Sequence, residues 1–486
     1  MAITPVNGSN GTDSSVVPLI IGGKDVQTTT TFDVVSPVSG KVLHQSSSAS
    51  VDDANRAAEA AQAAFQVWSK MNPIARRDLL LKAASIMESR KEELVGYQIE
   101  ETGAPRMFAE FTFALGLGIL KDFAGRSLSL EGTVPSVMDN GQSAIVVKEP
   151  YGVILGIAPW NAPLVLGSRA IAIPLAAGNT TILKGSEFCP KTFWALGDIY
   201  RQAGLPEGAV NVLYHRPSDA AEVTTALIAH PAVRKINFTG SSHVGSIIAS
   251  TAGKYIKPVL LELGGKASAI VLDDADLEKA AVSAVRGAFF HAGQVCMSTE
   301  RIVVQRSIAD KFRKVLVEAA EREFGKETPA PVLVSPAPVD KNRKLVADAV
   351  SKGAYVLFGD PNAREQAATS LRPLIVENVT KDMDLYSTES FGPSVSLFVV
   401  DTEEEAIALA NDTEYGLTAA VFTEDLRRGL RVARQIESGA VHINSLTIQD
   451  ESTLPHGGYK ASGYGRFGGC VGFDEFVQTK TITWMD

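Results

Sequence analysis

A glutamate and a cysteine are the residues of this chain whose types and setting best suit chemistry. Glu262 ends an apolar run and is followed by two glycines, and Cys296 follows a glycine-containing turn after an expected helix. A cysteine thiolate is a strong nucleophile, and a carboxylate can act beside it as a general base. Most free cysteines are small buried hydrophobes instead, and the two residues alone leave that alternative open.

Length and composition limit what the rest of the chain can be. A chain of 486 residues is too long for one hydrophobic core, so we expect two large domains and a smaller one. With 45% apolar and 21% charged residues it is typical of a soluble globular protein. A net charge of -9 without a basic run disfavours nucleic acid and anionic membranes as partners. Residues 1–17, rich in Ser, Thr, Asn and Gly, are expected to form a flexible tail.

The cysteines and histidines predict no metal site. Cys189, Cys296 and Cys470 are an odd number without a CxxC motif, so we expect neither a disulfide framework nor bound zinc. The histidines show no metal-ligand spacing. Free thiols indicate a reducing compartment, and we expect the cytoplasm.

The hydrophobic pattern predicts an α/β fold. Short strands are expected at 19–26 and 31–43, with a turn at 37–40, followed by helices that open at 51 and 72, a helix at 105–120 and a strand at 143–150. From Gly152, apolar strands at 153–158, 180–184, 210–213 and 235–238 alternate with helices that run to 172, open at 192 and cover 224–229. Such alternation predicts a parallel sheet covered on both faces, which binds ligands at the carboxyl ends of its strands.

Polar groups follow three of these strands. The run 238–245 places small residues at the start of a helix, where free N–H groups and the helix dipole favour a phosphate, although a simple capping turn would look the same. It is not the GxGxxG fingerprint of dinucleotide folds. Lys184 ends a buried strand and needs a partner. A ribose diol that accepts from Lys184 and donates to Glu187 would provide one.

Seven motifs in a fixed order carry a resemblance to a known family. From about Leu19 to its C-terminus the chain resembles the NAD(P)-dependent aldehyde dehydrogenases. The motifs are Pro159-Trp160-Asn161, Lys184-Gly185-Ser186-Glu187, Phe238-Thr239-Gly240-Ser241, Glu262-Leu263-Gly264-Gly265-Lys266, Gly293-Gln294-Val295-Cys296, Glu389-Ser390-Phe391-Gly392-Pro393 and Gly457-Gly458-Tyr459-Lys460-Ala461-Ser462-Gly463.

The resemblance implies three domains and an oligomer. A Rossmann-like cofactor-binding domain would comprise residues 18–132, 153–261 and 444–466, and an α/β catalytic domain residues 262–443. Residues 133–152 and 467–486 would form a small β oligomerisation domain, in which the strand at 479–484 extends a neighbour's sheet. Family members are homodimers or homotetramers, and both states stay open.

The resemblance also implies a reaction. Cys296 would attack an aldehyde to form a thiohemiacetal, whose oxyanion the Asn161 side chain and the Cys296 N–H would stabilise. After hydride transfer to the cofactor, Glu262 would activate the water that hydrolyses the thioester, so a free carboxylic acid is the expected product.

Cofactor contacts carry over from the family to matching positions. Lys184 and Glu187 would hold the adenosine ribose, and Glu389 the nicotinamide ribose with Phe391 beside it. A carboxylate at Glu187 repels a 2′-phosphate, so NAD is expected, with NADP as the alternative. Gly185 stands where the family more often has proline, which we expect to loosen this loop. The other expected cofactor-binding residues are Trp160, Thr239, Gly240, Ser241, Gly245 and Leu263.

The substrate pocket resembles that of the branch that oxidises salicylaldehyde, benzaldehyde and vanillin. We expect it to contain an apolar wall and polar groups at its rim, namely Val165, Leu166, Phe290, Val295, Met297 and Ile448 with Arg169, Asp450 and His456. This combination suits an aromatic ring with a hydroxyl. Arg169 could instead clamp the carboxylate of a semialdehyde, or form a structural salt bridge with Asp450 or Glu451. For His456 the alternative to a substrate contact is that its imidazole lies outside the pocket. A non-catalytic scaffold or binding protein on the same fold stays open as a different class of function.

Overall fold

The computed structural model describes residues 16–485 and confirms the α/β class. The expected N-terminal tail falls largely on residues 1–15, outside the described residues. Its last two residues are not a tail, because β1 (Val16–Val17) pairs in parallel with β5 (Val42–Ser47). No helix within residues 16–485 combines the length and apolarity needed to cross a membrane.

The larger of the two main sheets carries the parallel strands predicted from the sequence. Its eight strands are, in spatial order, β21 (Gly463–Tyr464), β11 (Val259–Glu262), β10 (Val233–Thr239), β7 (Val153–Ile157), β8 (Thr180–Lys184), β9 (Val210–Leu213), β2 (Leu19–Ile21) and β3 (Lys24–Val26). The strands β11, β10, β7, β8 and β9 are mutually parallel. The carboxyl ends of β7, β8, β10 and β11 therefore lie along one edge of this sheet.

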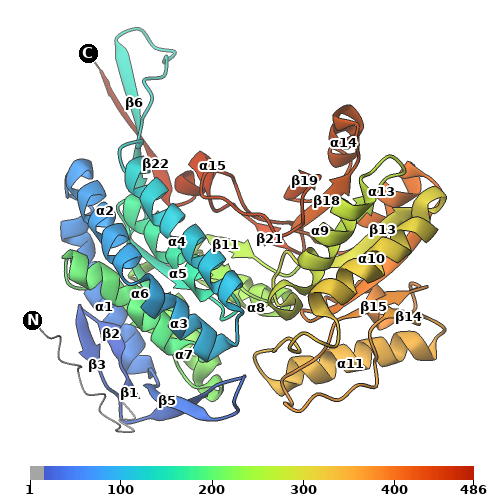
Figure 1. The fold of residues 1–486 in the computed structure, drawn as a ribbon. Helices are drawn as coiled ribbons and strands as arrows, with labels where there is room; N and C mark the ends of the chain where they lie inside the picture. The colour runs from blue at the N-terminus through green and yellow to red at the C-terminus, as the bar shows by residue number, and fades with distance from the viewer. Residues whose placement is uncertain (1–15, 486) are drawn as a thin grey trace, which may run out of the picture.

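Helices of the N-terminal half cover this sheet (Figure 1). They are α1 (Val51–Trp68), α2 (Pro73–Ser89), α3 (Lys91–Thr102), α4 (Arg106–Arg126), α5 (Pro163–Ala176), α6 (Pro190–Ala203), α7 (Ala220–Ala229) and α8 (Ser242–Lys254). α1 packs on β8 and α7, whereas α5 and α6 pack together beneath α2, α3 and α4. Gly116 on α4 permits close approach to α5, because a Cβ there would lie 2.7 Å from the carbonyl oxygen of Leu164.

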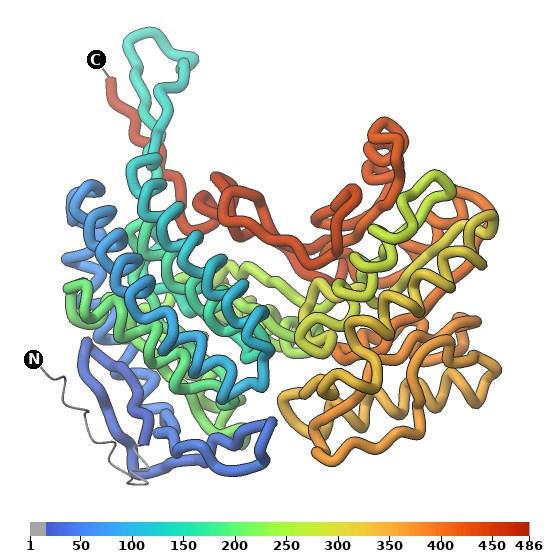
Figure 2. Tube along the Cα trace, in the orientation of Figure 1, coloured from blue at the N-terminus to red at the C-terminus, as the bar shows by residue number. Residues whose placement is uncertain are grey.

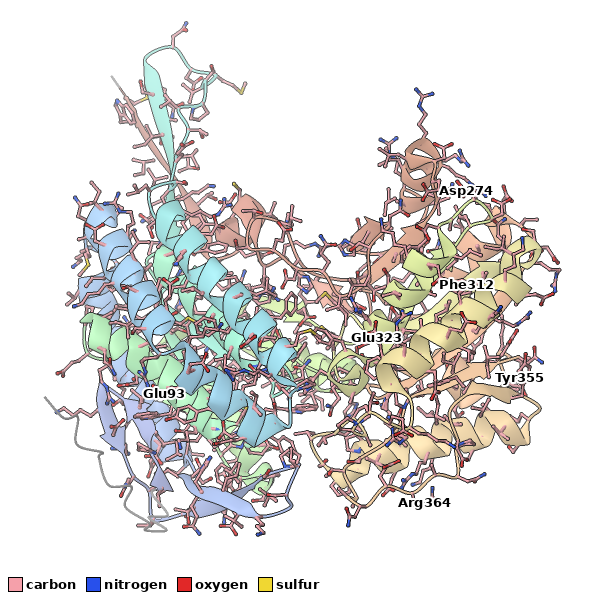
Figure 3. The ribbon with its side chains drawn as sticks, in the orientation of Figure 1. Glu93, Asp274, Phe312, Glu323, Tyr355 and Arg364 are labelled. Carbon is pink, nitrogen blue, oxygen red and sulfur yellow. The ribbon has the colours of Figure 1, made fainter. Side chains whose placement is uncertain are left out.

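The second main sheet occupies the other lobe of the molecule. Its seven strands are, in spatial order, β14 (Tyr355–Phe358), β15 (Leu374–Glu377), β16 (Ser394–Val400), β13 (Thr299–Gln305), β12 (Ala267–Val271), β18 (Thr418–Phe422) and β19 (Ala440–Ile443). The helices of this lobe are α9 (Leu277–Phe289), α10 (Ala309–Phe324), α11 (Pro336–Ser351), α12 (Asp384–Ser387), α13 (Glu403–Asn411) and α14 (Leu426–Ala433). Figure 3 labels Phe312 on α10, which is fully buried among the apolar residues between this sheet and its helices.

Three small sheets complete the fold. β4 (Thr31–Val35) joins β1 and β5, and β17 (Tyr415–Gly416) pairs with β20 (Tyr459–Lys460). β6 (Gln142–Pro150) pairs over its whole length with the terminal strand β22 (Val477–Met485), which follows α15 (Gly469–Asp474). Figure 2 shows this two-stranded ribbon projecting from the body of the molecule, with the C-terminus at its tip.

Most predicted elements are present, but one strand was predicted wrongly and one helix was not predicted. The segment 19–26 is a hairpin and not one strand, because Gly22 and Gly23 adopt positive φ angles of 59° and 77° and turn the chain between β2 and β3. The sequence reading also missed α3, which follows α2 without a break because Arg90 ends one helix and begins the next. The domain boundaries stay a prediction.

Candidate active site

A cleft of about 440 Å³ lies at the carboxyl ends of β7, β10 and β11. It brings together Glu262, Cys296 and Asn161, which lie far apart in the sequence. Its other lining residues are Pro159, Trp160, Thr239, Gly240, Ser241, Leu263, Gly264, Ala337, Pro338, Lys341, Glu389, Ser390 and Phe391. Ligand binding at this edge is what a parallel α/β sheet predicts.

Glu262 is placed by strands on both sides of it. It is the last residue of β11, opposite Thr239 of β10 and Gly463 of β21. The two glycines that follow allow close contacts, since a Cβ on Gly264 would lie 2.8 Å from a carboxylate oxygen of Glu389 and one on Gly265 2.4 Å from the Cys296 carbonyl oxygen. The double glycine therefore lets Glu262, Cys296 and Glu389 approach one another.

A strained turn places Cys296 in the cleft. After α9, the residues His291, Ala292 and Gly293 all have positive φ angles, of 49°, 58° and 73°. Gln294 holds this turn, because its Nε2 donates to the carbonyl oxygens of His291 (3.1 Å) and Val332 (3.2 Å) and its Oε1 accepts from Val334 N (2.9 Å). Strain of this kind gathers at functional sites, where surrounding contacts hold it.

Two hydrogen-bond donors face the same cleft. The Asn161 side chain is almost fully buried, and its Nδ2 donates one hydrogen to the Gln294 carbonyl oxygen at 3.0 Å. Its second hydrogen has no acceptor among residues 16–485, and within the same range the backbone N–H of Cys296 also has none. An amide with one hydrogen fixed and one free is oriented to donate to a bound group.

Burial raises the pKa values of Cys296 and Glu389 in the cleft. Burial, and then the charge of Glu262, raise the pKa of the Cys296 thiol well above its ordinary value, so the resting group is a thiol and not the thiolate. Burial likewise raises the pKa of Glu389 to about 7, although a hydrogen bond from Gly265 N (2.8 Å) opposes it.

Lys184 and Glu187 lie at the end of β8, where a ribose was expected. Burial lowers the pKa of Lys184 to about 8 and that of His215 to about 4, so the lysine donates to the neutral His215 Nε2 at 2.9 Å. Among the described residues no carboxylate forms an ion pair with Lys184. The ammonium and the half-buried Glu187 thus remain able to bind a diol. Gly185 does not loosen this loop, because its N–H donates to the Leu213 carbonyl oxygen at 2.8 Å and a Cβ there would lie 2.4 Å from the Phe193 ring.

The first turn of α8 offers the expected phosphate-binding geometry. Ser241 caps the helix by accepting from Val244 N at 3.3 Å, and residues 241–244 are at least partly exposed. Gly245 packs on Leu263, since a Cβ there would lie 2.5 Å from that side chain. Thr239 and Gly240 complete this wall. An exposed helix start lined by small residues fits a pyrophosphate.

The expected substrate-pocket residues divide into two groups, and neither lines the 440 Å³ cleft. Val165, Leu166, Val295, Met297 and Ile448 are buried in one apolar cluster, with Phe290 and Cys296 half-buried against it. They therefore form an apolar wall against which Cys296 packs.

Arg169 and Asp450 form the second group. They make a buried ion pair. Of the roles that were open for Arg169, the structure therefore contains the structural salt bridge, and Arg169 is not a free cation. His456 is buried beside them, with its Nδ1 3.9 Å from an Asp450 oxygen.

Sequence reasoning missed two contributions to the site. The rings of Phe108 and Phe111 on α4 lie 5.1 and 6.3 Å from the Phe290 ring and extend the apolar wall. Only the apolar periodicity of α4 could have pointed to them, and it does not say which helix face meets Phe290.

The second is a buried ion pair that holds the loop carrying Glu389. Lys266 Nζ lies 2.7 Å from Glu300 Oε2 and donates to the Thr388 carbonyl oxygen at 2.8 Å. Glu300 also accepts from the N–H groups of Ser390 (2.9 Å) and Phe391 (3.2 Å).

Comparison with known proteins agrees with this site. The model of the aldehyde dehydrogenase family matches residues 24–482. The vanillin dehydrogenase of Pseudomonas sp. (strain HR199) is 43% identical over 474 residues, 96% of this chain and 97% of that protein. The benzaldehyde dehydrogenase of Bacillus subtilis (strain 168) is 37% identical, with 92% of each chain covered.

Solved structures give the same result. A salicylaldehyde dehydrogenase from Pseudomonas putida G7, complexed with salicylaldehyde, superposes with a TM-score of 0.93 at 40% identity, covering 96% of this chain and 98% of that one. A betaine aldehyde dehydrogenase from Staphylococcus aureus in complex with NAD+ gives 0.91 at 31% identity, covering 96% and 94%. The chain belongs to the aldehyde dehydrogenase family. NAD(P)-dependent oxidation of an aldehyde is accordingly its reaction, as the sequence predicted.

Proposed function

We propose that this protein oxidises an aromatic aldehyde to its carboxylic acid with NAD as the hydride acceptor. The observation that carries the proposal is the convergence of Glu262, Cys296 and Asn161 in one cleft. The aromatic substrate is supported by the rings of Phe108, Phe111 and Phe290 near the nucleophile's turn, which suit another ring. It is also supported by the vanillin, salicylaldehyde and benzaldehyde activities named for the relatives.

Acylation begins at Cys296. Because burial keeps its thiol neutral, a base must remove the proton as the sulfur attacks the carbonyl carbon, and Glu262 lies in the same cleft. The new C–S bond makes a thiohemiacetal with a negative oxygen. The second Nδ2 hydrogen of Asn161 and the Cys296 N–H, both without protein acceptors within residues 16–485, donate to that oxygen.

NAD, when bound, supplies the hydride acceptor that turns the thiohemiacetal into a thioester on Cys296. The residues that would hold it are Lys184 and Glu187 at the ribose, Trp160, Thr239, Gly240, Ser241, Gly245 and Leu263 along the pyrophosphate wall, and Glu389 with Phe391 at the other end. Glu262 first gives up the proton that it took from the thiol. It then takes a proton from water as the water oxygen attacks the thioester, and it returns this proton to the sulfur as the C–S bond breaks.

Replacing Asn161 with alanine should lower kcat by about 10²–10³-fold, because one oxyanion donor is lost from a dry site. KM for the aldehyde should change much less, since the ground-state carbonyl carries little of this charge. Steady-state kinetics with benzaldehyde measure both constants. A rise in KM of the same size, without a fall in kcat, would show that Asn161 does not stabilise the transition state.

Replacing Glu187 with glutamine should make NADP a better cofactor relative to NAD, because the carboxylate that repels a 2′-phosphate becomes neutral. We expect the ratio of kcat/KM for NADP to that for NAD to rise roughly tenfold, on the order of 1.4 kcal/mol. Parallel kinetics with the two cofactors measure this ratio. An unchanged ratio would place the discrimination elsewhere.

The semialdehyde alternative needs Arg169 as a clamp for a substrate carboxylate. The ion pair with Asp450 already occupies this guanidinium, which disfavours that use.

A substrate panel tests the proposal. NADH formation at 340 nm is followed with NAD and with benzaldehyde, hydroxybenzaldehydes, aliphatic aldehydes and succinic semialdehyde. The aromatic aldehydes should give the highest kcat/KM. A preference for the semialdehyde would favour the alternative in which Arg169 clamps a substrate carboxylate. The absence of turnover on every aldehyde of the panel would favour a non-catalytic scaffold.

The assembly and location of the protein are part of the proposal. The β6–β22 ribbon exposes Ile482, Trp484 and Met485, which suits strand addition in a homodimer or homotetramer. The three cysteines are unpaired, which suits the cytoplasm.

A further inference from the structure

The side chain of Glu262 is fully buried, and among residues 16–485 the Cys296 thiol is the one hydrogen-bonding neighbour of its carboxylate. A buried carboxylate with so few partners carries a large desolvation cost, so such groups need a nearby basic group or a route for protons. His456 approaches it, with its Nε2 3.7 Å from Glu262 Oε1.

His456 is held in place from behind. Its Nδ1 lies 3.9 Å from Asp450 Oδ1, and Asp450 forms the ion pair with Arg169 on α5. The Arg169 guanidinium lies over the Phe467 ring at 5.2 Å. The His456 backbone exchanges hydrogen bonds with Phe467, of 2.6 and 2.8 Å, so the chain at this residue is fixed.

Charged and titratable groups from several elements surround the imidazole. Glu262 from β11 and Asp450 are acidic, and Arg169 is basic. His442 of β19 also faces this group, and its pKa is lowered by burial and by His456. The remaining titratable neighbour is Cys296, whose thiol is neutral. Imidazole is a side chain suited to act as a proton shuttle.

The reaction produces protons at this point. Glu262 holds the proton that it took from the Cys296 thiol, and it must lose that proton before it can accept one from the attacking water. The water's proton then returns to the sulfur as the C–S bond breaks. Glu262 itself is 0% exposed, whereas His456 is 7% exposed. A distance of 3.7 Å is longer than a hydrogen bond, and a movement of less than about 1 Å closes it, as happens when catalytic groups tighten around substrate.

On the basis of the proposed function, we propose that His456, beside the Asp450–Arg169 ion pair, takes from Glu262 the proton that came from the Cys296 thiol and so frees Glu262 to act in deacylation. The O–H bond on Glu262 breaks and an N–H bond forms at His456 Nε2. The proton then leaves to solvent, and Glu262 is again a carboxylate. His456 touches neither the aldehyde nor the cofactor in this scheme, so it is a positioning residue.

The test separates acylation from deacylation in the variant His456→Ala. With NAD and benzaldehyde, the variant should form one NADH per site in a burst as the wild type does, after which its steady rate should be lower by roughly 10–100-fold. Imidazole in the buffer should raise that steady rate in proportion to its concentration, because it replaces the missing proton acceptor. A structural role would not respond to imidazole.

Matched controls identify the proton path. Imidazole should not raise the steady rate of Glu262→Gln, since that variant has no carboxylate from which a proton must be removed. His230→Ala, which removes a half-buried imidazole at the end of α7, should keep both phases unchanged. His456→Gln, similar in size and able to donate a hydrogen bond but not to carry a proton, should keep the burst and lose the steady rate.

Three outcomes overturn the proposal. They are a wild-type steady rate in His456→Ala, a lowered steady rate that imidazole does not raise, and the loss of the burst in both His456 variants. Absence of NADH formation by the wild-type protein with every aldehyde would instead contradict the proposed function on which this inference rests.

Discussion

Replacing Glu262 with glutamine should give one NADH per active site and then an almost complete stall. Glutamine keeps the size of the side chain but cannot accept the proton of the attacking water, so the thioester on Cys296 persists. The steady-state rate should fall by about 10²–10⁴-fold, the usual contribution of a general base. Stopped-flow absorbance at 340 nm measures the burst and the steady rate in one experiment.

The burst itself will report whether Glu262 also acts in acylation. Because burial raises the pKa of the Cys296 thiol, a base is needed for the attack, and the burst of the variant should be slower than that of the wild type. Glu323→Gln is a matched control, because this carboxylate lies on α10 in a surface pair with Arg286 (Figure 3). A steady rate of Glu262→Gln equal to that of the wild type would show that Glu262 does not act in deacylation.

Replacing Cys296 with alanine should abolish both the burst and the steady state. No other group in the cleft can form the covalent intermediate, and removal of a nucleophile costs on the order of 10⁶-fold in kcat. Binding of NAD should persist, because none of the expected ribose and pyrophosphate contacts uses the sulfur. Fluorescence titration with NAD would verify that the variant is folded.

The other two cysteines provide the controls for this experiment. Cys470→Ala removes an exposed thiol, and Cys189→Ala removes a buried one at the start of α6. Both should retain the burst. Residual NADH formation by Cys296→Ala at a rate near that of the wild type would exclude the thioester route.

Much of the site could be predicted because short motifs at strand ends are local signals. Asn161, Glu262 and Thr239 each follow or end a parallel strand, and the rule for such sheets places their side chains at one edge. Cys296 could be placed only through the family resemblance, since its turn of left-handed residues has no simple pattern apart from Gly293.

The rest depends on contacts between distant segments. Helical spacing puts Arg169 on the expected face of α5, but it does not reveal that Asp450, 281 positions away, neutralises it. Hydrophobic periodicity also does not reveal the pairing of Lys266 with Glu300 or the position of Phe108 beside Phe290. The approach of His456 to Glu262 is of the same kind, because it results from the packing of a loop on β11.

The most direct test of the account is mass spectrometry of the protein quenched during turnover of an aromatic aldehyde with NAD. Glu262→Gln should accumulate an acyl group on the peptide that contains Cys296, at close to one per chain, with the mass of the aldehyde less two hydrogens. The same peptide from Cys296→Ala should stay unmodified. Sustained NADH production with no adduct on that peptide in Glu262→Gln would contradict the covalent mechanism.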